Sequence, residues 1–333
     1  MPDVVIQRVP AEDADFVAHL TTLGFRQIVL DLPSARFMSK FALILQTIRA
    51  PIRLFFRLRT VGKLETVVVL GHFAFLVKAL ARLRILRYER LLCSDFFVRS
   101  PTWFPVFRWL CRIDTANDHY LIFSRSEIDL YADRLAIDRS RMHYLPAGDW
   151  REPEEPAAVA AGDYYFAGGY SNRDYMPVIN AFRKIPAPLL IVCSTLNKEL
   201  DGVSLPPNVT VLRDLSSESF EDYLRRAKAG IVPLKHDTGA SGQTVLLRLM
   251  RNARMAIASD VGAVRDYIEH NVSGYLVQDM EGQLPGLIVS IESAPAAAAS
   301  MGQAARSRYM RHFSKSSLAE AFGSILLQTS RVS

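Results

Sequence analysis

The chain has 333 residues, half of them hydrophobic, and its 40 Lys and Arg exceed its 34 Asp and Glu to give a net charge of +6. This length permits two domains of ordinary size, and the composition excludes a disordered chain. The three cysteines are far apart and lack metal-binding spacing, which favours a reducing compartment. The first residues lack a signal-peptide pattern and no apolar run is long enough to span a bilayer, so we expect a cytoplasmic protein.

The first half of the chain alternates apolar strand patterns with helical ones. Strands are expected at residues 4–7, 27–32, 65–70, 90–93, 119–123 and 142–145. Helices are expected at residues 14–23, 73–86, 100–113 and 126–134. This alternation predicts an α/β domain with a parallel sheet over residues 1–150.

A basic segment at residues 36–63 interrupts the alternation. No acidic residue occurs from position 32 to 64, and Arg49, Arg53 and Arg57 recur every four residues beside aromatic and aliphatic side chains. A basic amphipathic segment of this kind suits an anionic membrane surface. A cationic solvent face on an ordinary helix is the alternative. Nucleic-acid binding is a third reading, but no nucleic-acid-binding motif accompanies the charge.

Residues 151–162, rich in Pro and Glu and then in Ala, predict an exposed linker before a second α/β domain. That domain is expected at residues 163–312, with a final helical segment at 313–333. Its strands are expected at residues 164–167, 188–193, 209–213, 230–234, 255–258 and 274–277. Its helices are expected at residues 175–183, 218–227, 243–250, 264–269, 284–293, 296–313 and 317–327.

Two loops of the second domain have the composition of phosphate-binding loops. The small residues of Thr238–Gly242 precede the helix that starts at Gln243, and Lys235 stands just before them. Unpaired amides at a helix start and the helix dipole favour a phosphate. In the other loop, Gly168-Gly169 permits close backbone approach and Arg173 offers a guanidinium fork.

Ordinary turn and cap residues with surface cations would give the same two patterns. Two such loops in one domain, each with its own cation, nevertheless favour a nucleotide diphosphate. Ligands of parallel α/β sheets bind beyond the carboxyl ends of strands, a rule that also selects His72 after the strand at 65–70. His72 is then a candidate contact for the ligand, with a capping or core histidine as the alternative.

Four segments carry a resemblance to a known family. They are LIFSRSEIDLYADRLAIDRSRMHYLPAG at 121–148, FAGGYSNRDYMPVINAF at 166–182, PNVTVLRDLSSESFEDYLRRAKAGIVPL at 207–234 and MAIASDVGAVRDYIEHNVSGYLV at 255–277. In this order they resemble glycosyltransferases of the family 4 type, which have two Rossmann-like domains facing a cleft, the GT-B fold. Residues 1–110 match this family only in outline.

The resemblance implies a metal-independent hexosyltransferase that uses a UDP- or GDP-type nucleotide sugar, with no further cofactor and with retention at the anomeric carbon. Binding of the donor then involves Gly168, Gly169, Arg173, Lys235, Ser241, Gly242, Thr244 and Arg248. The residues nearest the transferred sugar are then His72, Asp237 and Gln243. The resemblance also implies that the final helix crosses back to pack on the first domain.

One departure from the family concerns two glutamates that usually lie eight positions apart. Alignment on Ala258-Ser259-Asp260 places Ala240 and Arg248 at these positions. Asp237 partly replaces the first carboxylate. Arg248 has only donors, so it suits a phosphate rather than a ribose hydroxyl.

The sequence therefore predicts a glycosyltransferase acting on a lipid-linked or polysaccharide acceptor in glycan or exopolysaccharide assembly. The basic segment places it as a peripheral protein on the inner face of a membrane. A catalytically inactive transferase-like binding or scaffold protein is the alternative, and a basic nucleic-acid-binding protein is less favoured. The sequence does not specify the base, the sugar, the acceptor or the oligomeric state.

Overall fold

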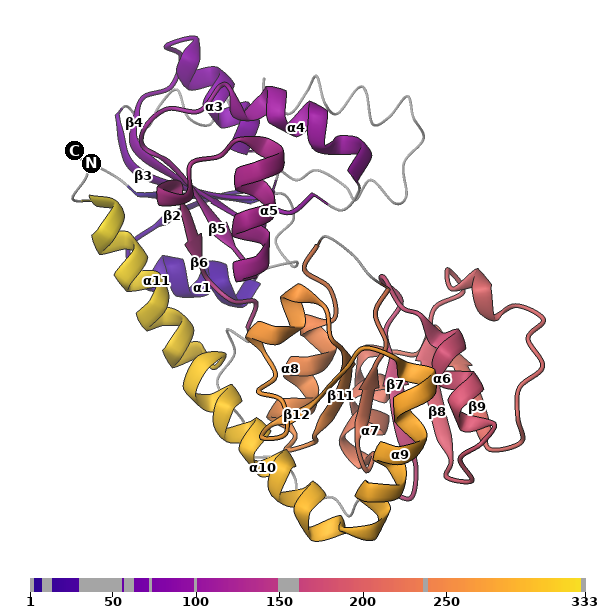
Figure 1. The fold of residues 1–333 in the computed structure, drawn as a ribbon. Helices are drawn as coiled ribbons and strands as arrows, with labels where there is room; N and C mark the ends of the chain where they lie inside the picture. The colour runs from indigo at the N-terminus through magenta and orange to yellow at the C-terminus, as the bar shows by residue number, and fades with distance from the viewer. Residues whose placement is uncertain are drawn as a thin grey trace. The chain divides into compact units, whose positions relative to one another are not determined.

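The structure is a computed structural model that describes residues 3–7, 14–29, 56, 63–71, 74–98, 101–148, 162–235 and 239–330. The chain divides into two compact units, the first made of Met1–Pro146 with Ala319–Ser333 and the second of Ala147–Leu318 (Figure 1). Each unit contains a six-stranded sheet, and every strand pair in both sheets is parallel. The predicted α/β class with two parallel sheets is confirmed.

The sheet of the first unit has the strand order β2-β1-β3-β4-β5-β6. Its strands are β1 (Val4–Gln7), β2 (Arg26–Val29), β3 (Leu64–Leu70), β4 (Tyr88–Ser94), β5 (Asp118–Ile122) and β6 (Met142–Tyr144). Its α-helices are α1 (Ala14–Thr22), α3 (Ala74–Arg82), α4 (Phe104–Cys111) and α5 (Arg125–Leu135). Short 3-10 turns, Pro101–Trp103 and Arg139–Arg141, precede α4 and β6.

An aromatic cluster fills the core between this sheet and helices α3, α4 and α5. Phe96 lies at its centre, with ring centroids 4.9 Å from Tyr120, 5.3 Å from Tyr131 and 6.0 Å from Phe107. All three are edge-on contacts, the geometry that aromatic quadrupoles favour. Together with β-branched residues of β3, they form the core on this face of the sheet.

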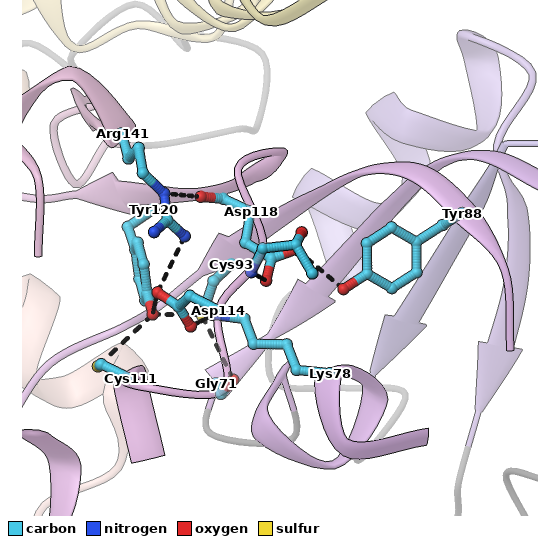
Figure 2. Close-up of polar contacts among 10 residues, drawn as sticks. Gly71, Lys78, Tyr88, Cys93, Cys111, Asp114, Asp118, Tyr120 and Arg141 are labelled. Carbon is cyan, nitrogen blue, oxygen red and sulfur yellow. Dashed lines mark hydrogen bonds and ion pairs between the residues drawn. The ribbon is translucent and has the colours of Figure 1, made fainter. Parts of the chain in front are cut away.

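A buried ion pair crosses the same core (Figure 2). Lys78 on α3, with a side chain that is 0% exposed, contacts the Asp114 carboxylate at 2.8 Å and donates to the Tyr120 hydroxyl at 2.8 Å. The Tyr120 hydroxyl donates to the other Asp114 oxygen at 2.7 Å, and Arg141 contacts that oxygen at 2.9 Å. Both charges are therefore compensated, which a buried charge requires.

Neighbouring groups extend this network. Tyr88 donates to Asp118, whose second carboxylate oxygen accepts from the Thr115 amide at 2.7 Å. Burial raises the pKa of Cys93 to about 12 and that of Cys111 to about 11, so both thiols stay protonated at neutral pH. All three cysteines of the chain are free.

The carboxyl-terminal helix α11 (Lys315–Ser330) contributes its later turns to the first unit. Phe322 meets Phe16 of α1 edge-on with ring centroids 5.6 Å apart. Arg90 on β4 donates to the Leu326 carbonyl and to Thr329 Oγ1. A cation at the last turn of a helix complements the negative end of its dipole, so Arg90 fixes the end of α11 on the sheet.

A histidine pair lies on the opposite sheet face from the buried ion pair. His119 on β5 and His143 on β6 approach to 3.1 Å between Nδ1 and Nε2, and His119 is 4% exposed. Burial is the main cause that lowers the pKa of His119 to about 4, with His143, Arg141 and Arg90 adding repulsion. Burial also lowers the pKa of His143.

We expect this pair to make the protein sensitive to acid. Because the folded pKa of His119 lies below its ordinary value of about 6.5, the neutral pair stabilises the fold above pH 6.5, and this contribution is lost as the pH falls toward 4. Urea unfolding should show that the free energy of unfolding falls between pH 7 and pH 5, by up to about 1.4 kcal/mol per pH unit for each proton taken up. The substitution His119→Gln should flatten this dependence, and an unchanged slope would show that other groups control it.

The sheet of the second unit has the strand order β12-β11-β10-β7-β8-β9. Its strands are β7 (Tyr165–Gly168), β8 (Leu189–Cys193), β9 (Val209–Arg213), β10 (Gly230–Val232), β11 (Ala256–Ser259) and β12 (Gly274–Val277). Its helices are α6 (Tyr175–Phe182), α7 (Ser217–Arg226), α8 (Gln243–Arg251), α9 (Met280–Ser293) and α10 (Pro295–His312), with 3-10 turns at Lys198–Leu200 and Gly262–Asp266. α6 and α9 pack on one face, α7 and α8 on the other, and α10 contributes to both cores.

Some expected elements differ from the observed ones. The helix expected at 73–86 ends at Arg82, because the chain turns at residues 83–84 with a positive φ at Arg84. The helix expected at 264–269 is the 3-10 turn Gly262–Asp266, and the helix expected at 100–113 begins with a 3-10 turn. The linker at 151–161 and nearly all of the basic segment at 36–63 lie outside the described residues.

In the described part of the chain, no single helix is long and apolar enough to cross a bilayer. The stretches Met280–Ser293 and Pro295–Ser330 pass that test of length and composition only as a pair, and they are bent by 104° relative to each other.

Candidate functional site

The two candidate phosphate loops lie side by side in the second unit. They follow β7 and β10, which are neighbours in the sheet. Beyond the strand ends, Arg173 and Leu234 form an isolated antiparallel bridge. The Asp174 amide donates to the Pro233 carbonyl at 3.1 Å, and the Lys235 amide donates to the Asn172 carbonyl at 3.3 Å. The fold therefore brings both loops together at the carboxyl edge of the sheet, where ligands of such sheets bind.

Arg173 lies beneath the first loop and is 4% exposed. Its Nε donates to the Gly168 carbonyl at 2.9 Å and its Nη1 to the Ser171 carbonyl at 2.6 Å. Gly169, at φ +109°, packs directly on the guanidinium, because a Cβ there would lie 2.6 Å from Nη2. The arginine thus holds its own loop closed with two of its donors.

No described residue places a carboxylate in an ion pair with Arg173. Burial lowers the pKa of this guanidinium, although an arginine remains charged at neutral pH. A buried positive charge whose partners among the described residues are carbonyl dipoles makes the surrounding loop attractive to an anion.

The start of α8 supplies backbone donors to the same edge. Gly242 is its N-cap residue, in the left-handed region at φ +87°, and no side chain caps the helix. The Val245 and Leu246 amides both donate to the Gly242 carbonyl at 3.1 Å. Among the described residues, the Gln243 and Thr244 amides have no acceptor. Free amides at a helix start are the groups that bind phosphate.

Gln243 adds a buried donor at this position. Its side chain is 8% exposed, and Nε2 has no hydrogen-bond partner among the described residues. A buried donor without a partner is destabilising unless a ligand or water satisfies it. Ser241 and Thr244 flank the turn, Ser241 half-buried and Thr244 exposed.

Lys235 and Arg248 differ in whether a described carboxylate pairs with their charge. The Lys235 side chain is exposed beside the bridge to the first loop. Arg248 points instead to α7, where its Nε lies 3.6 Å from the Glu221 carboxylate and its Nη2 donates to Ser217 at 3.2 Å. The guanidinium of Arg248 therefore already has an anionic partner, whereas Lys235 is available to a ligand.

Two predicted residues, His72 and Asp237, lie outside the described residues. Two others were not selected from the sequence as site residues but line the same edge. Ser259 accepts from the Leu234 amide at 2.8 Å, which ties β11 to the second loop. Asp260 pairs with Arg265 at 2.7 Å, and this hydrogen bond holds the pKa of Asp260 below its usual range. The signal in the sequence that could have identified these two residues is a Ser-Asp pair directly after an apolar strand pattern.

A cavity of about 250 Å³ opens at this edge, beyond β10, β11 and β12. It is lined by Asp174, Pro177, Pro233, Leu234, Ser259, Asp260, Val277, Gln278, Asp279 and Met280. Among the described residues, no group of three His, Cys, Asp or Glu side chains is placed to hold a metal ion. The polar groups of this edge are therefore backbone amides, cations and isolated carboxylates.

Comparisons with known proteins agree with this geometry. Residues 165–289, which contain both loops, match the model of a family described as "Glycosyl transferases group 1". A search of curated proteins found no match. The match covers the carboxyl edge of the second sheet, the part of this chain that is similar to glycosyltransferases of this group.

Solved structures show the fold of the whole chain. It resembles a glycosyltransferase from Rickettsia africae ESF-5 at 13% identity, with 100% of each chain covered and a TM-score of 0.72. It resembles sucrose-phosphate synthase (tll1590) from Thermosynechococcus elongatus at 18% identity, with 100% of each chain covered and a TM-score of 0.73. It resembles Anabaena Alr3699/HepE in complex with UDP-glucose at 11% identity, over 98% and 99% of the two chains, with a TM-score of 0.72. The fold is therefore of the GT-B glycosyltransferase type, and fold and family match together support a role in glycosyl transfer.

Proposed function

We propose that the protein transfers a sugar from a nucleotide diphosphate sugar of the UDP or GDP type to a lipid-linked or polysaccharide acceptor. The observation that carries this proposal is a set of hydrogen-bond donors and cations at the carboxyl edge of the second sheet, which suits an anion. There the free amides of Gln243 and Thr244, the exposed Lys235 and the buried charge of Arg173 gather on two adjoining loops. The similar HepE structure is a complex with UDP-glucose, which supports a uridine nucleotide as the first donor to test.

These groups suit the departure of a nucleoside diphosphate. When the bond between the anomeric carbon and the diphosphate breaks, its electron pair and the negative charge remain on the diphosphate. Fixed amides and cations stabilise that charge without having to reorganise, which lowers the barrier. The acceptor hydroxyl oxygen then bonds to the anomeric carbon, and its proton passes to an oxygen of the departing diphosphate. We propose that this occurs with retention and without a metal ion, and that Gln243 orients the sugar.

The location of the protein follows from the same proposal. A lipid-linked acceptor requires access to a membrane surface, and the basic segment at 36–63 suits the inner, anionic face. We therefore propose a cytoplasmic protein that binds the membrane peripherally, in the assembly of an exopolysaccharide or a similar glycan.

A catalytically inactive relative is the second candidate. Ala240 and Arg248 stand where the family usually has two glutamates, and Arg248 is bound to Glu221 and Ser217. A protein with an intact phosphate site and no carboxylate beside the sugar would bind a nucleotide without transferring its sugar.

A thermal-shift screen of nucleoside diphosphates and their sugars tests the proposal. We expect UDP or GDP and its sugar to raise the melting temperature, and the substitution Lys235→Ala to weaken binding about tenfold, because a charge-assisted contact contributes about 1.5–3 kcal/mol. Lys184→Ala is the matched control, an exposed lysine just after α6. No stabilisation by any nucleotide would contradict glycosyl transfer. Binding without donor hydrolysis above the Lys235→Ala background would favour the inactive relative.

A further inference from the structure

Helix α4 and the 3-10 turn before it have one face in the core of the first unit. Phe104 and Cys111 are buried, and Phe107 packs against Phe75 and Phe96 with centroid distances of 5.7 and 6.0 Å. The segment is held firmly to the sheet by these contacts, so its outer face has a defined orientation.

The outer face of this segment is aromatic and aliphatic. Trp103 is 56% exposed, Val106 43% and Trp109 62%. Residues three apart on a helix are neighbours, so these side chains form one exposed stripe. Tryptophan is mostly buried in proteins that stay in water, and an exposed stripe with two of them marks an interaction surface.

The stripe is flanked by positive charge. Arg108 and Arg112 are exposed, lie four residues apart on the adjacent strip of the helix, and form no ion pair with a described residue. No acidic residue occurs between Asp95 and Asp114. We call these five residues, Trp103, Val106, Arg108, Trp109 and Arg112, the α4 surface.

The turn after the neighbouring helix α3 has the same chemistry. Leu83 and Ile85 are 69% and 48% exposed, beside the exposed side chains of Arg82, Arg84 and Arg87. α3 and α4 are each followed by a strand of the same parallel sheet, so both helices end at its amino edge (Figure 1). The exposed residues after α3 therefore lie at the same edge of the sheet as Trp109 and Arg112 at the end of α4.

We propose that the α4 surface binds the headgroup region of an anionic lipid bilayer. Tryptophan favours this region because its ring is apolar and its indole N–H is polar, while arginine pairs with lipid phosphates. The absence of acidic residues from the segment complements the negative surface potential of such a membrane. The inference rests on the proposed function only in that a lipid-linked acceptor requires the protein to bind a membrane. It assigns the membrane contact to described residues outside the basic segment at 36–63.

Tryptophan fluorescence reports directly on this surface. The chain has three tryptophans, and the substitution Trp150→Phe leaves only Trp103 and Trp109. Phosphatidylcholine vesicles containing phosphatidylglycerol should shift the emission of this variant to shorter wavelength, and brominated lipids should quench it. Vesicles that bind without either change would overturn the inference, because the membrane would then contact another surface.

Vesicle sedimentation measures the strength of the contact. The double substitution of Trp103→Ser with Trp109→Ser should lower the partition coefficient by roughly tenfold or more, because the buried apolar area is lost. Arg108→Gln and Arg112→Gln should each lower the partition coefficient about fivefold, and added salt should diminish that difference from the wild type. Unchanged binding of the tryptophan double variant would refute the role of the α4 surface.

Controls separate this inference from the other proposals. Tyr223→Ser with Val289→Ser removes exposed apolar side chains from the second unit and should leave vesicle binding unchanged.

The tryptophan double variant should keep its full thermal shift with the nucleotide that stabilises the wild type. If it binds vesicles normally but loses self-association in light scattering, the α4 surface contacts a second copy and the membrane assignment is wrong. If no nucleotide raises the melting temperature of the wild type, that result would instead contradict the proposed function.

Discussion

Replacing Asp114 by Ala is expected to lower the free energy of unfolding of the first unit by about 3–5 kcal/mol. Asp114 is the anion shared by Lys78 and Arg141, and the Lys78 side chain is fully buried. Without Asp114 the partners of the ammonium group among the described residues are the Tyr120 hydroxyl and the rings of Tyr120 and Phe75, and the desolvated charge is no longer compensated by an anion. Urea unfolding of the full chain carrying Trp150→Phe, followed by the fluorescence of Trp103 and Trp109, measures the effect in this unit.

Two further variants make this result specific. Lys63→Ala removes an exposed ion pair with Glu89 in the same unit and should have little effect, because exposed pairs are screened by water. Replacing both buried partners, Lys78→Met with Asp114→Leu, should recover part of the loss, since the buried ammonium group is gone and only the partly exposed Arg141 loses its anion. If Asp114→Ala unfolds at the same urea concentration as Lys63→Ala, the buried pair does not stabilise the unit.

The substitution Gly242→Val is expected to weaken nucleotide binding by roughly 100-fold or more, because two charge-assisted hydrogen bonds contribute at least about 1.5 kcal/mol each. Gly242 has φ +87°, and an added Cβ would lie 3.1 Å from Leu234 and 3.2 Å from Val232. A β-branched residue is strained in this left-handed conformation. The turn would therefore shift and carry the amides of Gln243 and Thr244 away from the phosphates. Isothermal titration with UDP or GDP measures the change.

The same loop offers a matched control. A Cβ at Gly239 would meet no atom within 4 Å, so Gly239→Ala should bind nucleotide as the wild type does. If Gly242→Val proves too unstable to measure, Gly242→Ala imposes a milder strain and should still weaken binding. Normal affinity in a folded Gly242→Val protein would show that the start of α8 does not hold the diphosphate.

Much of the architecture could be predicted from local patterns. Short β-branched runs such as residues 65–70 alternate with helical periodicity, and both signals depend only on neighbouring residues. The alternation therefore indicated two parallel sheets, which the structure confirms. The small residues before Gln243 likewise indicated the turn at the start of α8, because glycine is the residue that most readily adopts a positive φ.

The candidate site was less predictable, because the state of each charge depends on distant partners. Arg173 and Lys235 look equivalent in the sequence, yet the first is buried against the carbonyls of Gly168 and Ser171 and the second is exposed. Arg248 suggested a phosphate contact, and only the packing of α8 on α7 places it beside Glu221. His72 and Asp237 stay predictions.

The sequence by itself determined the order of strands and helices and the position of the glycine turn before α8, since these follow from periodicity and from the backbone preferences of small residues. Only the tertiary structure decided which side chains meet and which remain in water. Lys78 and Asp114 pair across 36 positions of sequence. The segment around Trp103 and Trp109 has aromatic and aliphatic residues on more than one face, and the packing of Phe107 against Phe75 and Phe96 determines which of these faces is left exposed. Such choices depend on contacts between distant residues, which no local pattern encodes.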